Sequence, residues 1–534
     1  MAIFKYATQP ERDENPAFKI RTSADGWRPF DHSDLVAIGA VCRQWYETIR
    51  ADPLRWVCVD NHNSCRLQMF TERSSPLPLT LFLASWSDVD VLLALREHGT
   101  RAKRLHVSYS TKSPCPLEAF SFPAPSLETF ILYGSDNFNA SADLHVDESL
   151  LFGTQAHPLR AIAISPVVDW LPGNRFPNLT HLYLSFDLRP SNQLSDILIP
   201  LSNSPHLEVV QLARVPVRLD VRTTHGGNLI VLQHLKHIMF LSGSDFQSSI
   251  ALLRRLELAS TAFVYFDAIS VGSSTVADGV VDSSSLPPWR GGDITRLEVG
   301  TEYTAMHLLV EGPSSGIFLR TAPDEYEAAP GEYWVQWLFA LPAIFPTGLT
   351  TVRVARIRLD SAGNNISRLL CAMSQVEELE IIFPFYGDVP SSSEGEDSLD
   401  HVSRILSREC PQLHTFIVIL EQDRMASVET YERQASRLIA MLDARTRIGK
   451  RVRRLRFQVH WRPSEREDDN KIIYPLFRPA GEHVDEYESY EADERLSGFR
   501  TRPEWWDLSE DDPERYWDLE EEDWPMAYQL PWLE

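Results

Sequence analysis

The chain has 534 residues, a formal net charge of −24 at pH 7 and a hydrophobic content of 43%. A chain this long exceeds one ordinary compact core, so we expect several domains or an array of repeats. The acidic balance argues against nucleic acid, whose phosphate backbone binds clustered Lys and Arg, and against anionic membranes. We therefore expect neither a nucleic-acid partner nor a membrane partner.

Residues 1–30 are polar and mixed, and we expect them to be poorly ordered. The following residues, 31–60, predict a compact helical module. Ser33 can cap a helix with its hydroxyl group, and Pro53 ends the helix at Asp52. Apolar residues recur between them at spacings of three and four, which places on one helical face Leu35, Ile38, Val41, Cys42, Trp45 and Ile49. Periodicity alone favours a helix packed against its own domain.

The order of residues in this module resembles the second half of an F-box, the small helical module that docks on the Skp-type adaptor of cullin–RING ubiquitin ligases. The matching residues are Val41, Cys42, Arg43 and Trp45, followed by Ile49, Pro53, Leu54 and Trp56. Residues 67–83 resemble the segment after the box in the large F-box families of fungi. The leucine-proline-x-glutamate signature of the family's first helix has no match before Asp31.

The resemblance implies a substrate-recognition subunit of a cullin–RING ubiquitin ligase, which binds a protein substrate and is not itself an enzyme. It also implies a set of adaptor-binding residues, namely Leu35, Ile38, Val41, Cys42, Trp45, Pro53, Leu54 and Trp56. The missing first-helix signature leaves an alternative open. In that alternative the chain is a repeat scaffold that binds a protein partner and never meets the adaptor.

Residues 61–101 are expected to link the module to the rest of the chain. An apolar alternation at residues 79–83 predicts a strand, and a short helical pattern follows at residues 89–96.

Residues 102–460 carry a loose recurring pattern of six residues. Its first, fourth and sixth residues are apolar, and the other three can be of any type. Composition alone produces this pattern often, so the prediction depends on its context. Several copies follow a proline, which stops a helix and favours extended backbone, and several follow a run of helical period. The spacing between first residues varies from 18 (Leu235 to Leu253) to 55 (Ile294 to Leu349).

Helix, proline turn and short strand together form the unit of a leucine-rich-repeat array. The irregular copies in this chain resemble the degenerate repeats found behind fungal F-boxes. We therefore predict an α/β fold, in which the short helical F-box-like module precedes an irregular leucine-rich-repeat solenoid with a curved parallel sheet.

In each predicted strand, the residue between the last two apolar positions points away from the core. These residues are mostly neutral or apolar in the early copies and mostly charged in the later ones, as at Glu298 and Arg353. Exposed apolar side chains in a row are unusual on a protein surface. We therefore predict that an unknown protein substrate binds at Ile131, Tyr183 and Met239, and loops that cover these side chains are the alternative.

The last segment, residues 461–534, is acidic and rich in tryptophan. Residues 482–524 contain 18 Asp and Glu against 4 Arg, and the tryptophans from residue 505 onward are Trp505, Trp506, Trp517, Trp524 and Trp532. So much like charge opposes collapse of the segment on its own. Either its aromatic residues dock on the end of the solenoid as a cap, or it is a disordered ligand that folds on a basic partner.

Catalytic and cofactor motifs are missing from the sequence. It contains no phosphate-binding, dinucleotide-binding, nucleophile-elbow or zinc-protease motif. The six cysteines include no C-x-x-C pair, which is typical of free thiols in a reducing compartment. We therefore expect no catalytic residue, no metal and no cofactor. No signal peptide or membrane-spanning run is evident, so we expect an intracellular protein, cytoplasmic or nuclear.

Overall fold

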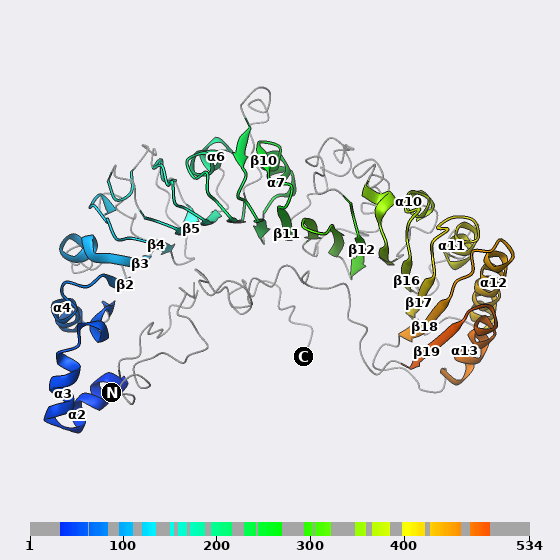
Figure 1. Cartoon of the computed structure of the whole chain (residues 1–534), viewed down its shortest axis with the longest axis horizontal. Helices are drawn as coiled ribbons and strands as arrows, with labels where there is room; N and C mark the ends of the chain where they lie inside the picture. The colour runs from blue at the N-terminus through cyan, green and yellow to red at the C-terminus, as the bar shows by residue number, and fades with distance from the viewer. Residues whose placement is uncertain are drawn as a thin grey trace. The chain divides into compact units, whose positions relative to one another are not determined.

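A computed structural model describes residues 33–61, 64–83, 95–109, 120–134, 150–153, 158–167, 171–186, 194–215, 229–241, 244–269, 293–302, 305–321, 348–358, 366–384, 398–421, 428–460 and 470–491. These residues form two compact units, which divide between Leu235 and Lys236. Each unit is α/β with a mostly parallel sheet, so the predicted fold class holds at this level (Figure 1). The division falls inside the stretch 102–460.

The first unit begins with a helical segment that leads into a parallel sheet. Its helices are α2 (Ser33–Val41), α3 (Arg43–Arg50), η1 (Pro53–Trp56), α4 (Ser64–Arg73), η2 (Gly99–Arg101) and α6 (Leu194–Ser202). Its strands are β1 (Cys58–Asp60), β2 (Leu79–Leu83), β3 (Ala102–Tyr109), β4 (Thr129–Gly134), β5 (Ala161–Val167), β6 (His181–Phe186), β7 (Val209–Ala213) and β8 (Ile230–Leu232). Strands β1 to β7 pair in chain order, each parallel to the next.

The second unit has ten strands in one sheet, with the order β9-β11-β14-β13-β12-β15-β16-β17-β18-β19. They are β9 (His237–Leu241), β11 (Phe263–Ile269), β12 (Arg296–Glu302), β13 (Ala305–Glu311), β14 (Gly316–Thr321), β15 (Val354–Arg358), β16 (Glu378–Pro384), β17 (Thr415–Glu421), β18 (Arg454–His460) and β19 (Glu486–Glu491). Its remaining elements are α7 (Phe246–Leu253), β10 (Leu256–Leu258), η5 (Gly348–Thr351), α10 (Ile366–Ala372), α11 (Ser398–Leu406), α12 (Val428–Arg447), α13 (Asn470–Phe477) and η6 (Arg478–His483).

Pairing in the second sheet is parallel except at β13, which runs antiparallel to both β12 and β14. The expected sheet was parallel throughout, and this three-stranded meander departs from it. The connections between the three strands are only two and four residues long, and so short a connection permits only antiparallel pairing. The copy at Leu253 forms a strand as predicted, but this strand, β10, lies outside the main sheet. The prediction was wrong at Leu349, where the chain forms η5.

The two faces of the second sheet differ in chemistry because side chains alternate along each strand. One face carries the core, with Leu379, Ile381, Phe416, Val418, Leu455 and Phe457 fully buried. Helices α10, α11 and α12 cover this face (Figure 1). The other face, called here the open face, carries mainly charged residues between β12 and β19. The core positions are the apolar residues that the sequence pattern predicts.

Residues of opposite charge lie next to each other at several positions in the row of residues at the starts of the strands, called here the strand-start row. In the first unit, the Glu128 amide donates to the Lys103 carbonyl at 2.7 Å, and the Arg160 amide donates to the Glu128 carbonyl at 2.8 Å. The side chains of Lys103 and Glu128 lie 3.3 Å apart. In the second unit, Glu377 lies 4.0 Å from Arg353 on one neighbouring strand and 3.8 Å from His414 on the other. These pairs favour the observed strand register.

An arginine holds the turn between helix and strand in each unit, half-buried Arg101 in the first and buried Arg445 in the second. Arg101 donates to the Thr71 carbonyl at 3.0 Å and to the Leu77 carbonyl at 2.9 Å, at the end of α4. Arg445 of α12 is fully buried and donates to five carbonyls at the end of α11 and in nearby turns, those of Leu406, Glu409, Cys410, Leu413 and Lys450. Each guanidinium thereby satisfies carbonyls that the helix leaves without partners.

Candidate protein-binding surfaces

The first candidate surface lies on α2, α3 and η1, the segment that the sequence likens to an F-box. One continuous helix was expected from residue 35 to 49, but the helix is interrupted at Cys42, whose backbone is extended with φ −161° and ψ 164°. Helix α3 restarts at once, because the Tyr46 amide donates to the Cys42 carbonyl at 3.0 Å. The interruption places Val41 and Cys42 at an exposed corner.

Trp56 fixes this segment to the rest of the first unit. Its indole N–H donates to the Ile49 carbonyl at 3.0 Å, and its ring meets the edge of Phe70 with centroids 4.8 Å apart. The Arg73 guanidinium lies 4.4 Å from the centre of the indole ring, a cation–π contact. Ile49 and Trp56 are both buried. Trp56 therefore belongs to the core that supports the surface, and its predicted contact with an adaptor stays a prediction.

The eight residues predicted to bind an adaptor divide by exposure. Val41 and Leu54 are 61% and 70% exposed, and Cys42 is also exposed. The half-buried members are Ile38, Trp45 and Pro53, and Trp56 is buried. Leu35 lies in α2, and its side chain is outside the described part of the structure. The exposed apolar members form a small surface, called here the Val41–Leu54 surface.

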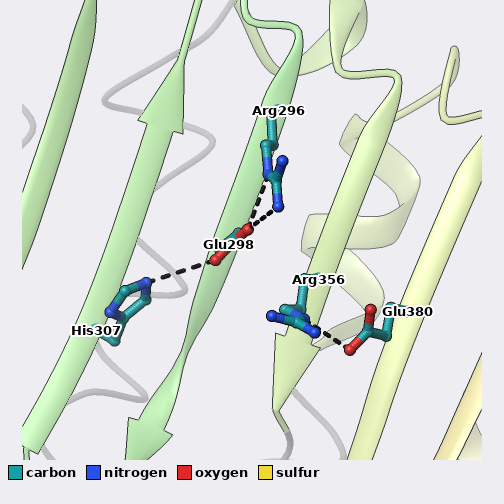
Figure 2. A network of polar contacts seen from close by, with 5 residues as sticks. All are labelled: Arg296, Glu298, His307, Arg356 and Glu380. Atoms are coloured by element: carbon teal, nitrogen blue, oxygen red, sulfur yellow. Dashed lines mark hydrogen bonds and ion pairs between the residues drawn. The ribbon is translucent and has the colours of Figure 1, made fainter. Parts of the chain in front are cut away.

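The second candidate surface lies on the open face of the second unit, where Arg296, Glu298, His307, Arg356 and Glu380 form a polar network (Figure 2). Backbone register places Glu298, Arg356 and Glu380 opposite one another on β12, β15 and β16. Arg296 Nε donates to Glu298 Oε1 at 2.8 Å, and Arg356 Nε donates to Glu380 Oε1 at 2.6 Å. His307 Nε2 lies 3.7 Å from Glu298 Oε2.

Burial and charge act in opposite directions on the two carboxylates. Glu298 is completely buried, which by itself raises its pKa, but the contacts with His307, Arg296 and Arg356 lower the pKa to about 2. Burial raises the pKa of Glu380 above its ordinary value, and nearby Glu298 and Glu378 add to this, although Arg356 opposes them. Glu298 is therefore an anion at neutral pH, and the cations Arg296 and Arg356 stabilise its charge.

The charged row continues at the far end of the same sheet. Arg456 Nε donates to Glu488 Oε2 at 2.9 Å, and Arg454 Nη2 donates to Glu488 Oε1 at 2.5 Å. Arg454 Nε also lies 3.3 Å from Glu486 Oε2. Between the network and this cluster the row is interrupted by half-buried Ile417 of β17. The open face thus presents fixed charges of both signs on separate strands.

The third set of predicted binding residues is less accessible than expected. Ile131 and Met239 are each 1% exposed, and Tyr183 is half-buried. In the first unit, Ile131 lies in register between His106 and Ala163, which are also buried. The expectation that Ile131 and Met239 are exposed is therefore wrong, although the strands place them as predicted. Partner binding by these three residues stays a prediction.

Sequence reasoning found part of the network and missed the rest. It placed Glu298 and Glu380 correctly at outward positions. On β15 it predicted Arg353 as the outward residue, whereas Arg356 occupies that position, because the expected strand began three residues too early. His307 was missed because it lies on the antiparallel strand β13, which matches no repeat copy. The alternation Val354-Ala355-Arg356-Ile357-Arg358 is the signal that identifies the correct strand.

The part of the chain that the structure describes contains no group of three or more His, Cys, Asp or Glu able to hold a metal ion. None of its helices is long and apolar enough to cross a membrane. No protein-family model matches the sequence, and no curated protein matches it. Similar solved structures include the leucine-rich repeat-containing protein LegL7 from Legionella pneumophila, at 12% identity and a TM-score of 0.24, over 59% of this chain and 83% of that chain.

Proposed function

We propose that the chain is a protein-recognition subunit of a cullin–RING ubiquitin ligase. In this role the helical segment at residues 33–61 binds the Skp-type adaptor, and the sheet-bearing units bind a protein substrate. The chain supplies binding and positioning, and the ligase partners supply the chemistry.

The observation that carries the proposal is the exposure of Val41 and Leu54. An aliphatic side chain left in water forgoes up to about 1.5–3 kcal/mol of burial free energy, so two of them on a small, well-anchored segment favour a protein contact. Trp56 and Ile49 hold the segment from behind, which leaves the Val41–Leu54 surface available. The resemblance to the second half of an F-box supplies the class of partner.

The open face of the second unit supports substrate binding. Buried Glu298 holds Arg296 in place, and Arg356 is paired with Glu380; such preorganised charges give specificity and orientation more than affinity. A protein substrate with complementary charges is the kind of ligand that this face would recognise.

A second function, a repeat scaffold without adaptor binding, is favoured by one observation. The family's first-helix signature has no match in the sequence, and the helix that follows is interrupted at Cys42. A scaffold would use the open face in the same way but would leave the Val41–Leu54 surface for another partner.

The experiment is a pulldown of a purified Skp-type adaptor with the full chain, together with the double variant Val41→Asp/Leu54→Asp. We expect the wild type to bind and the variant to lose at least about tenfold in affinity, because two carboxylates would be desolvated at the contact. Ile448→Asp is the matched control, since Ile448 is a similarly exposed aliphatic residue in the second unit. Wild-type protein that does not bind the adaptor would establish the scaffold function instead.

A further inference from the structure

The last strand of the second unit, β19, differs from the strands before it in how it is held. On β18 the core-facing residues Leu455 and Phe457 are fully buried. Their register partners on β19 are Tyr487, which is half-buried, and Ser489, which is exposed. Strand β19 therefore adds little to the apolar core, and backbone pairing and charge must hold it in place.

The charges on β19 match those on β18. Glu486 and Glu488 are separated by one residue, as are Arg454 and Arg456, so that all four side chains lie on the open face. The contacts are 3.3 Å for Arg454–Glu486 and 2.9 Å for Arg456–Glu488. At the start of the strand Arg451 lies 3.1 Å from Asp485. These ion pairs are partly exposed, which makes them weak and sensitive to salt.

The basic side of this contact is unusual for so acidic a chain. Residues 445–456 contain seven Arg and Lys and no Asp or Glu, whereas the chain as a whole has a net charge of −24. Arg445 holds the fold from within, but Arg451, Arg454 and Arg456 all bind the acidic segment at residues 483–491. A basic strand edge paired with an acidic strand is a site for an extended acidic peptide, because main-chain hydrogen bonds supply the affinity and alternate side chains the specificity.

We infer that the edge of β18 is a binding site for an acidic extended peptide of a partner protein, and that β19 occupies this site in the free chain. The recognised feature is two carboxylates separated by one residue, on a strand that runs parallel to β18. The chain's own segment is tethered beside the site, so its high effective concentration keeps out weak competitors. Adaptor binding plays no part in this site.

The test is a fluorescence-anisotropy titration of a labelled peptide with the sequence of residues 484–491 against the full chain. Replacing Glu486→Gln and Glu488→Gln in the chain weakens β19 but leaves the arginines intact. We expect this double variant to bind the peptide about tenfold more tightly than the wild type, because its own strand competes less. Raising the salt concentration from about 50 mM to about 500 mM should weaken peptide binding.

The controls separate the ion pairs from general charge and from folding. Adding Arg454→Gln and Arg456→Gln to the double variant should abolish peptide binding, whereas Arg454→Lys and Arg456→Lys should retain part of it. Arg447→Gln should change nothing, because Arg447 is a highly exposed arginine of α12 whose partner is Asp443. Peptide binding of equal strength to the wild type and to the Glu486→Gln/Glu488→Gln variant, or binding that survives loss of both arginines, would overturn the inference.

Discussion

The indole N–H of Trp56 bonds to the carbonyl of Ile49, a residue at the end of the preceding helix, across a distance of 3.0 Å. This bond joins α3 to η1 across the turn that Pro53 creates, and both residues are buried. The bond holds α3 and η1 in a fixed relative position, which their hydrophobic periodicity does not predict.

Replacement of Trp56 by alanine should lower the free energy of unfolding by about 3–5 kcal/mol, because a large buried ring and its hydrogen bond are lost. Trp56→Phe should retain roughly half of that stability, since phenylalanine fills most of the space but has no N–H donor. Chemical denaturation followed by circular dichroism measures both. Trp45→Ala is the comparison at a half-buried tryptophan, and an equal loss there would contradict the special role of Trp56.

Arg445→Met should destabilise the protein by about 3–5 kcal/mol, because methionine fills the volume but leaves five carbonyls, three of them in buried hydrogen bonds, without their charged donor. Arg447→Met, two residues away and largely exposed on the same helix, should change stability by less than about 0.5 kcal/mol. Thermal unfolding of the two variants beside the wild type is the measurement. Equal melting temperatures for all three proteins would show that the carbonyls find other partners.

His106 should make the protein less stable in mild acid. It is fully buried beside Phe82, and desolvation lowers its pKa to about 3 from the ordinary value of 6.5. Between these values the unfolded chain binds a proton that the folded protein does not, so stability is complete above pH 6.5 and falls as the pH decreases. The expected loss from pH 7 to pH 5 is about 2 kcal/mol.

The measurement for His106 is the free energy of unfolding at pH 7 and pH 5, for the wild type and for His106→Gln. The difference between the two pH values should shrink in the variant, because glutamine does not titrate. His414→Gln, at a more exposed histidine, is the comparison variant. An unchanged dependence in His106→Gln refutes the buried neutral form.

Glu298→Gln should lower the free energy of unfolding by about 3 kcal/mol at pH 7, since it leaves Arg296 and His307 without their shared anion. The pKa of Glu298 is about 2, below the ordinary 4.5, so the carboxylate contributes stability above pH 4.5 and loses it as the pH falls towards 2. Wild type and variant should therefore converge in stability over that range. Glu377→Gln, at a half-exposed pair, is the control that should show little effect at any pH.

The strands could be predicted from sequence wherever a repeat copy follows a clear turn. Alternation at Leu79, Leu81 and Leu83 identified β2 correctly, and the copies at Leu179 and Leu413 matched β6 and β17. Such strands place an apolar residue at every core position, and this pattern is visible in the residues themselves. The copy at Leu349 failed, because its apolar spacing also fits the short helix η5.

The candidate surfaces were harder to predict. Hydrophobic periodicity predicts one continuous helix that includes Val41 and Cys42. The extended backbone at Cys42 exposes both side chains, and neither residue type predicts that the helix is interrupted there. The network at Glu298 includes His307, which lies on the antiparallel strand β13. The repeat pattern does not predict this strand. Strand β19 extends the sheet beyond β18, whereas the predicted docking of the tail tryptophans falls on residues outside the described part of the chain and stays a prediction.

The strand-start row limits how this protein can change its length. Lys103, Glu128 and Arg160 follow one another on adjacent strands with alternating sign, as do Arg353 and Glu377. Deleting the single repeat that carries Glu128 would bring Lys103 beside Arg160, and like charges directly opposite on paired strands are destabilising. Deleting the repeat that carries Thr180 would instead bring Arg160 beside Glu208, a pair of opposite charges. Loss of a repeat from such an array should therefore be tolerated according to the charges that it brings together.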